Sequence, residues 1–314
     1  MLASLDGMQQ AARRVAGVAV RTPVVDLQPV SALQVKCEQL QPIGAFKVRG
    51  ALNFMAQVPP GLLAAGVVTY SSGNHGQAVA FAAQRLGVPA LIVMPETAPA
   101  VKVDGARRWG AEVEFAGTTT LHRQARAETL ARERGLVVVP PFDCLRIIEG
   151  QGTVGLELIE QVPGLRAAYV PVGGGGLISG VAAALKLSDP SIRVIGVEPT
   201  GAAKMSRSLA AGRPVTLEQV SSRADGLLAV RPGLLNFLHV QAFVDEVITV
   251  DEDEIADSVR WLFEAGRLAV EPSGATAVAG ARRHAGDAVR PGEVVAILSG
   301  GNIGAEAFAE IIHA

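Results

Sequence analysis

The sequence predicts an α/β protein whose parallel sheets are covered by helices on both faces. Short runs rich in β-branched residues alternate with longer alanine-rich stretches of helical period. The strand-like runs are apolar throughout, as expected of strands buried on both faces of a parallel sheet. With 314 residues, 49% of them hydrophobic, the chain is long enough to build a large core in two lobes.

The first half of the chain alternates strand and helix. "GVVTYSS" opens the series as a strand, and the helical stretch after it ends at Gly87, a residue type common at helix C-termini. The expected strands are 66–72, 88–95, 111–117 and 136–142, and the expected helices are 74–87, 100–110 and 120–135.

The second half continues the alternation. The expected strands are 167–173, 192–199, 244–250 and 292–302, and the expected helices are 152–162, 176–188 and 251–266. Ligands of such sheets bind beyond the carboxyl ends of the strands. The loops "SSGNHG", "GGGG" and "SGGN" each follow a strand, so we expect them to form the functional site.

Composition excludes several classes of function. A formal net charge of −2, from 28 basic and 30 acidic residues, gives no global field for nucleic acid or an anionic membrane. No apolar run reaches the roughly 18 residues that cross a bilayer, and the first residues lack the apolar core of a signal peptide. Cys37 and Cys144 are too few for a disulfide framework or a zinc site. We expect a cytoplasmic protein without nucleic-acid or membrane partners.

The stretch "PVGGGGLISG" predicts an anion site. Four consecutive glycines expose backbone N–H groups at a helix N-terminus, where phosphate binds favourably. One glycine would be explained by a tight turn, but four favour phosphate. Glu198 stands where a ribose-binding acid of a dinucleotide site would be expected, yet Ile178 replaces the third glycine of that fingerprint. A nucleotide-binding oxidoreductase and a binding protein without activity remain alternatives.

Lys47 is the candidate reactive residue. The chain has only five lysines, and this one follows Phe46 in the apolar, glycine-bounded stretch "QPIGAFKVRGALNF". A buried lysine with a lowered pKa serves as a nucleophile or a base, whereas most lysines merely extend into solvent. Combined with a phosphate site, such a lysine suggests pyridoxal phosphate as the cofactor.

Five segments, in order along nearly the whole chain, resemble the serine and threonine dehydratases and serine racemases, which are pyridoxal-phosphate enzymes with a tryptophan synthase β-like fold. The segments are "KCEQLQPIGAFKVRGALNF", "SSGNHGQAVAFAAQRLG", "GQGTVGLELIEQ", "PVGGGGLISG" and "LSGGN". The resemblance implies two open, twisted, mostly parallel sheets in two lobes. Residues 1–55 and 145–314 would form the large cofactor-binding lobe, and residues 56–144 an inserted small lobe that closes on the substrate.

The resemblance also implies roles for single residues. Lys47 would form a Schiff base with the cofactor and then act as the base at the substrate Cα. Asn74 would bind the ring hydroxyl, and Ser299 would face the pyridine nitrogen. The implied cofactor contacts are Phe46, Lys47, Asn74, Gly173, Gly174, Gly175, Gly176, Leu177, Glu271 and Ser299. The loop for the substrate carboxylate would comprise Ser71, Ser72, Gly73 and His75.

One departure concerns a cation site. "GVEPTGAAK" resembles the stretch that binds a divalent cation in some relatives, where Glu198 and the Ala202 carbonyl would be ligands. Lys204 stands where the third ligand, an acid, would be. Since an ammonium cannot ligate a metal, we expect Lys204 to replace the cation and pair with Glu198, and a bound divalent cation is not expected. The alternative is an empty site with Lys204 in solvent.

The implied reaction is the α,β-elimination of a β-hydroxy amino acid, L-threonine or L-serine, to a 2-keto acid and ammonia. Racemisation of serine, with Ser72 delivering a proton to the opposite face, is the alternative, as is another substrate such as 3-hydroxyaspartate or phenylserine. The chain ends soon after "LSGGN", so we expect no regulatory domain and a catabolic or specialised role. The resemblance further implies a homodimer.

Overall fold

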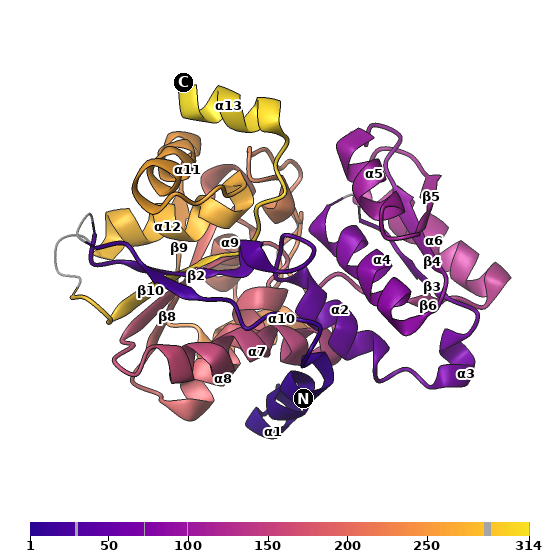
Figure 1. Cartoon of the computed structure of the whole chain (residues 1–314), viewed down its shortest axis with the longest axis horizontal. Coiled ribbons are helices and arrows are strands. Elements are labelled where there is room, and N and C mark those ends of the chain that lie inside the picture. The colour runs from indigo at the N-terminus through magenta and orange to yellow at the C-terminus, as the bar shows by residue number, and fades with distance from the viewer. Residues whose placement is uncertain (29–30, 72, 99, 286–289, 314) are drawn as a thin grey trace.

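The computed structural model describes residues 1–28, 31–71, 73–98, 100–285 and 290–313, which form two sheets, each with its own helices (Figure 1). The two sheets occupy separate lobes that lie side by side, and helix α2 lies where the lobes meet (Figure 1). α2 (Lys47–Met55) packs against helices of both lobes, α4 on one side and α7 on the other.

The larger sheet has six strands in the order β1-β2-β10-β7-β8-β9. All neighbours pair in parallel except β1 and β2, which pair antiparallel. The strands are β1 (Val24–Asp26), β2 (Gln34–Cys37), β7 (Ala167–Pro171), β8 (Arg193–Pro199), β9 (Glu246–Val250) and β10 (Val294–Leu298).

Helices cover both faces of this sheet. Because successive side chains of a strand point to opposite faces, Ala168 and Val170 of β7 pack in the cluster that includes α7 and α8, while Tyr169 packs in the cluster that includes α11 and α12. The helices of this lobe are α1 (Leu5–Val15), α7 (Leu145–Gln161), α8 (Gly176–Ser188), α9 (Lys204–Ala211), α10 (Leu234–Phe243), α11 (Glu252–Gly266), α12 (Pro272–Ala285) and α13 (Ala305–His313).

The smaller sheet has four parallel strands in the order β5-β4-β3-β6. The strands are β3 (Val67–Thr69), β4 (Ala90–Met94), β5 (Glu112–Phe115) and β6 (Val137–Val138), and the helices are α3 (Pro60–Leu63), α4 (Asn74–Leu86), α5 (Ala100–Arg107) and α6 (Thr120–Arg134). All of these elements lie within residues 56–144. The exact division of the chain into two domains stays a prediction.

The predicted α/β class is confirmed, and two of the differences in element bounds have a clear physical cause. The strand expected at 136–142 is only Val137–Val138 by its pairing, because Pro140 and Pro141 have no N–H to donate to a ladder. The helix expected at 152–162 begins at Leu145. Gly150 weakens the helical pattern there, but a Cβ on it would lie 2.6 Å from Gly50 Cα of α2, so tertiary packing requires the glycine.

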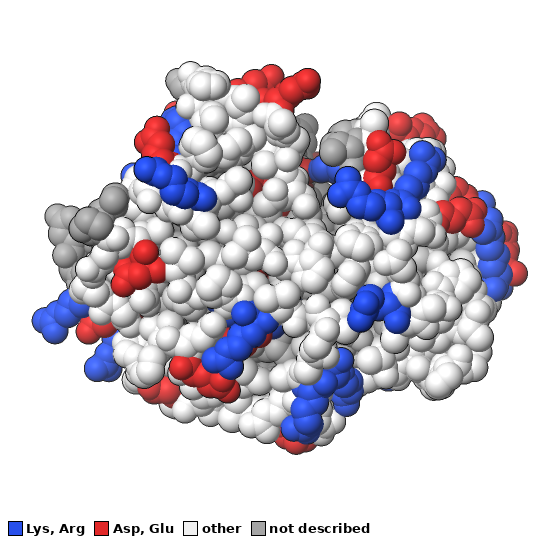
Figure 2. Space-filling model, viewed as in Figure 1, with Lys and Arg blue, Asp and Glu red and all other residues white. Residues whose placement is uncertain are grey.

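Sequence periodicity also left several helices without a prediction, namely α1, α2, α3, α9, α10, α12 and α13. Within the described ranges, no helix is long and apolar enough to cross a membrane. The surface seen in Figure 2 carries acidic and basic groups interspersed around a broad uncharged centre, and it is notched between the two lobes at the top of the view.

Candidate active site

Lys47 is the first residue of α2, and the loop before it is held against the end of β10. The backbone N–H of Phe46 donates to the carbonyl of Ser299 at 3.1 Å, and Ala45 forms an antiparallel bridge with Gly300. These contacts join the Lys47 stretch to the "SGGN" segment, more than 250 residues later in the chain. Two of the predicted motifs therefore meet at the carboxyl edge of the larger sheet.

The amine of Lys47 is enclosed but not paired with an acid. Nζ donates to the carbonyl of Pro141 at 2.9 Å and lies 5.1 Å from the centroid of the Phe46 ring. Among the described residues no carboxylate forms an ion pair with it. Burial lowers the pKa of Lys47 to about 8. A neutral, nucleophilic amine is therefore far more populated than in an ordinary lysine.

The tetraglycine turn (residues 173–176, the glycine loop) joins β7 to α8 and has room for backbone only. Gly175 has a φ of 102°, in the left-handed region, and no side chain caps the helix. A Cβ on Gly174 would lie 2.5 Å from the Phe142 ring, and one on Gly176 would lie 3.0 Å from Phe142 Cβ. The turn thus presents a helix N-terminus without a side-chain cap, and this arrangement fits a phosphate group.

Helix α10 holds the glycine loop from the other side. The carbonyl of Gly174 accepts from Asn236 Nδ2 at 2.9 Å and from the backbone N–H of Gly233 at 3.0 Å. Asp143 in turn caps α10 by accepting from the backbone N–H groups of Leu234 and Leu235 at 2.9 and 2.8 Å. Asn236 and Asp143 were not predicted, because neither belongs to a glycine-rich or lysine-bearing motif.

Pro141 and Phe142 connect the amine and the glycine loop. The carbonyl of Pro141 accepts from Lys47, while the ring of Phe142 lies against Gly174. These two consecutive residues are therefore flanked by the reactive amine on one side and the phosphate-type turn on the other. A small aldehyde that carries a phosphate fits this arrangement, because the amine can react with the aldehyde and the turn can bind the phosphate.

Asn74, Glu271 and Asn302 form a hydrogen-bonded row beside the end of β10. Asn74 donates from Nδ2 to Glu271 Oε1 at 2.6 Å and accepts at Oδ1 from Asn302 Nδ2 at 2.8 Å. Burial first, and then the charge of Asp225, raise the pKa of Glu271 to about 8. At neutral pH this side chain is therefore mostly a neutral acid. Asn302 was missed as a site residue, although it is the last letter of "LSGGN".

Ser299 lies at the end of β10 and Leu177 at the start of α8. Ser299 directly follows β10, is buried, and donates from Oγ to the carbonyl of Ser273 at 3.3 Å. Leu177 is buried in the first turn of α8, directly after the glycine loop.

The loop expected to receive a substrate carboxylate runs into the N-terminus of α4. A Cβ on Gly73 would meet no atom of the described residues within 4 Å, and Ser71 Oγ accepts from the N–H of this N-cap residue at 3.3 Å. The buried ring of His75 instead contacts the carbonyl of Val139 at 3.2 Å, and burial with the nearby Lys47 charge lowers its pKa to about 3. The His75 ring is thus neutral and is bonded to the backbone at Val139. Ser72 lies outside the described residues.

Lys204 is fully buried and occupies a cage of oxygen atoms. Its Nζ donates to the carbonyls of Val172, Ala202 and Leu227 at 2.7, 3.0 and 3.0 Å. Glu198 Oε2 lies 3.7 Å from Nζ. Burial lowers the pKa of Lys204 to about 8, and Glu198 opposes that shift. Within the part of the chain that the structure describes, no cluster of three or more metal-ligating side chains is present.

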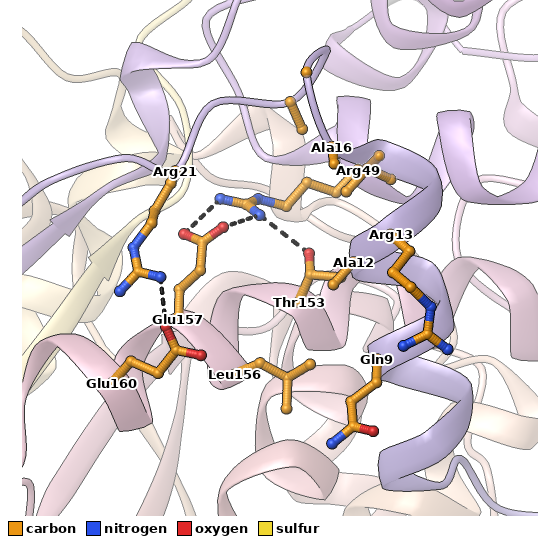
Figure 3. A pocket seen from close by; sticks show the side chains of 13 residues that line it. Gln9, Ala12, Arg13, Ala16, Arg21, Arg49, Thr153, Leu156, Glu157 and Glu160 are labelled. Atoms are coloured by element: carbon orange, nitrogen blue, oxygen red, sulfur yellow. Dashed lines mark hydrogen bonds and ion pairs between the residues drawn. The ribbon is translucent and has the colours of Figure 1, made fainter.

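A cavity of about 580 Å³ lies elsewhere, between α1, α2 and α7 (Figure 3). Arg49 reaches it from α2 and donates to Glu157 and Thr153 at 2.6 and 3.1 Å. Residues two apart on a helix point about 200° apart, so Lys47 and Arg49 serve opposite faces of α2. None of the described residues predicted for the site lines this cavity.

Comparison with known proteins gives concordant matches. The family model described as "Pyridoxal-phosphate dependent enzyme" matches residues 15–300. An L-threonine ammonia-lyase of Geobacter sulfurreducens is 43% identical over 279 residues, which are 88% of this chain and 69% of that protein. A serine racemase of Oryza sativa subsp. indica is 40% identical over 310 residues, 96% of this chain and 91% of that protein. The solved structure of maize serine racemase matches with a TM-score of 0.94 and 39% identity, covering 100% of this chain and 98% of that one.

Proposed function

This chain belongs to the pyridoxal-phosphate-dependent enzyme family, and from that premise we propose that it is an ammonia-lyase for a β-hydroxy amino acid. The substrate is L-threonine or L-serine, and the products are a 2-keto acid and ammonia. One observation carries the proposal: the buried amine of Lys47 and the glycine loop flank the same two residues, Pro141 and Phe142. The similarity to an L-threonine ammonia-lyase supports the choice of reaction.

The residues present fit pyridoxal phosphate. The glycine loop and Leu177 would bind the phosphate through their backbone amides, and Lys47 would bind the aldehyde covalently. Phe46 would pack beside the ring, with Asn74 at its hydroxyl, Ser299 at its nitrogen, and Glu271 behind Asn74. When bound, the cofactor withdraws electrons from the substrate Cα and so eases removal of its proton.

Lys47 acts as the base in this proposal. The ε-amine lies within the enclosure of Phe46 and Pro141, where it would be placed to take the Cα proton of a bound substrate. Its pKa of about 8 leaves roughly a tenth of the amine neutral at pH 7, far more than in an ordinary lysine, which suits the removal of a Cα proton. The neutral hydroxyl of Ser299 would face the ring nitrogen of the cofactor and could not keep it protonated as a carboxylate would, which would favour the loss of a β-substituent.

The N-terminus of α4 would hold the substrate carboxylate. Gly73 caps that helix without a side-chain hydrogen bond, so the first N–H groups and the helix dipole are available to an anion. Ser71 and Ser72 would contribute their hydroxyls. For His75 we propose a contribution through the backbone N–H alone, because its ring is bonded to Val139.

Serine racemisation is the second candidate. It is favoured by the similarity to a rice serine racemase along 96% of this chain. Ser72 would supply a proton to the opposite face of Cα. Other β-hydroxy amino acids, such as 3-hydroxyaspartate and phenylserine, are further candidate substrates for elimination. The dinucleotide-binding alternative is wrong, since the family model covers the glycine loop.

Further parts of the proposal concern the whole protein. We propose a homodimeric, cytoplasmic enzyme with a large lobe of residues 1–55 and 145–314 and a small lobe of residues 56–144. Lys204 would replace a divalent cation beside Glu198, which its oxygen cage supports. The small lobe would exclude water from the reacting centre when it closes.

The test uses a panel of L-threonine, L-serine, 3-hydroxyaspartate and phenylserine with the purified holoenzyme. We expect release of a 2-keto acid, and chiral analysis of the remaining serine separates elimination from racemisation. Lys47→Ala should lower the rate by about 10²–10⁴-fold or more, because it removes the base and the covalent anchor. Lys186→Ala, in a lysine of α8 that pairs with Asp245, is the control and should retain activity. If none of the four amino acids yields a 2-keto acid, the proposal is wrong.

A further inference from the structure

One ion pair spans the two lobes. Lys102 of α5, in the lobe of the smaller sheet, donates from Nζ to Asp225 Oδ2 at the start of the short helix η3 (Asp225–Leu227) of the other lobe. Of the ion pairs within the described ranges, it alone joins residues 56–144 to the rest of the chain. Both side chains are partly exposed, at 25% and 49%, so solvent and ions can reach the pair.

The aspartate end of this pair is fixed against the glycine loop. A Cβ on Gly173 would lie 3.2 Å from the carbonyl of Gly226, the residue after Asp225. The N–H of Gly226 donates to Ser273 Oγ at 2.9 Å. The carbonyl of Leu227 accepts from the buried Lys204 at 3.0 Å. The turn that carries Asp225 is therefore a rigid part of the phosphate-type site.

The lysine end is fixed to the loop that would receive the substrate. Ala106 and Val103 of α5 are buried in the same core cluster as α4. A Cβ on Gly105 would lie 2.9 Å from Gln77 Cδ, so α5 packs closely on α4. Because α4 begins at Asn74, a movement of α5 also moves the start of the substrate loop helix.

The charges of Lys102 and Asp225 also affect the pKa of Glu271. Asp225 raises and Lys102 lowers the pKa of the buried Glu271, which is hydrogen-bonded to Asn74. The pair thus lies close enough to Glu271 to influence its pKa. Its contacts reach the glycine loop on one side and the Asn74 helix on the other.

We infer that the Lys102–Asp225 pair is a latch that holds the lobe of the smaller sheet closed over the site, with Lys102 as a positioning residue for the reaction. A partly exposed ion pair is weak and breaks readily. Such a latch suits a lobe that must open to admit substrate and release product. The kinetic part of this inference rests on the proposed function, whereas the closure itself does not.

The experiment is a double-mutant cycle with Lys102→Met, Asp225→Asn and both together, read by hydrogen–deuterium exchange of α5 in the substrate-free holoenzyme. Each single change should raise α5 exchange about two- to fivefold, the range expected of an exposed pair. The double variant should add little to either single change, because one interaction is lost in all three. The reversed pair, Lys102→Asp with Asp225→Lys, should restore protection.

Steady-state kinetics provide the second measurement. Each single change should raise KM by a similar factor and leave kcat unchanged or higher, since opening becomes easier. The matched control is the Lys186–Asp245 pair, which lies within one lobe at 2.8 Å, and Lys186→Met should leave α5 exchange unchanged. Additive effects in the cycle, or unchanged α5 exchange in both single variants, would overturn the latch. A wild-type enzyme inactive on every substrate would instead overturn the proposed function and leave the exchange result standing.

Discussion

At the scale of single residues, Lys47 shows how an ordinary side chain becomes reactive. The stretch around it is apolar, and the described part of the folded chain adds a carbonyl from Pro141 but no carboxylate. Desolvation therefore acts without an opposing charge and lowers the pKa to about 8. By contrast, the lysine at position 36 is also buried but pairs with Glu157 and is locked in a structural role.

This difference predicts a pH dependence for cofactor capture. Only the neutral amine of Lys47 attacks an aldehyde, so the rate at which apoenzyme binds pyridoxal phosphate should rise about tenfold per pH unit below the pKa. The rate should level off above about pH 8, where the amine is already neutral. Stopped-flow measurement of the visible absorbance that appears on binding checks this expectation. A rate that is still rising steeply above pH 9 would show an ordinary lysine.

At the scale of elements, α2 carries two functions on two faces. Lys47 faces the site, whereas Arg49 turns into a buried ion cluster with Glu38 and Glu157. Arg49 and Glu38 are 1% and 0% exposed, so each would be costly to bury without the other. The cluster anchors α2 to α7 and so fixes the start of the helix that presents the amine.

Arg49→Met should therefore lower the free energy of unfolding by about 3–5 kcal/mol, since it leaves Glu38 buried without its partner. Arg21→Met is the matched control: Arg21 lines the same cavity but pairs with Glu160 at an exposed site, where the loss should be at most about 1 kcal/mol (Figure 3). Chemical denaturation of both variants measures the difference. Equal losses would mean that the buried cluster has no special role.

At the scale of the whole molecule, contacts between distant segments set the geometry of the site. Lys204 binds carbonyls from three separate segments, one of them at Val172 directly before the glycine loop. Glu198 completes the cage. A fixed ammonium thus holds together parts of the chain that a bound cation could equally hold.

The replacement can be tested by restoring an acid. Lys204→Asp places a carboxylate beside Glu198 and the Ala202 carbonyl, a set of oxygen ligands suited to a divalent cation. Added Mn²⁺ or Ca²⁺ should raise the melting temperature of this variant, with a stabilisation of about 2.7 kcal/mol at a hundredfold excess over Kd. The wild type and Lys204→Met should not respond. A wild-type protein stabilised to the same extent would contradict the replacement.

The sequence alone was sufficient for the fold class, because the period of apolar residues is local information. Lys47 and the glycine loop were predicted from the rarity of lysine, a run of four glycines and the family resemblance, and their roles stay predictions. Only the tertiary structure decided which residues contact these side chains. Pro141 at the amine, Asn302 at Asn74, the cage around Lys204 and the contact of Lys102 with Asp225 all join residues distant in the chain. Such pairings depend on how loops pack at the sheet edges, and the period of a sequence does not report that packing.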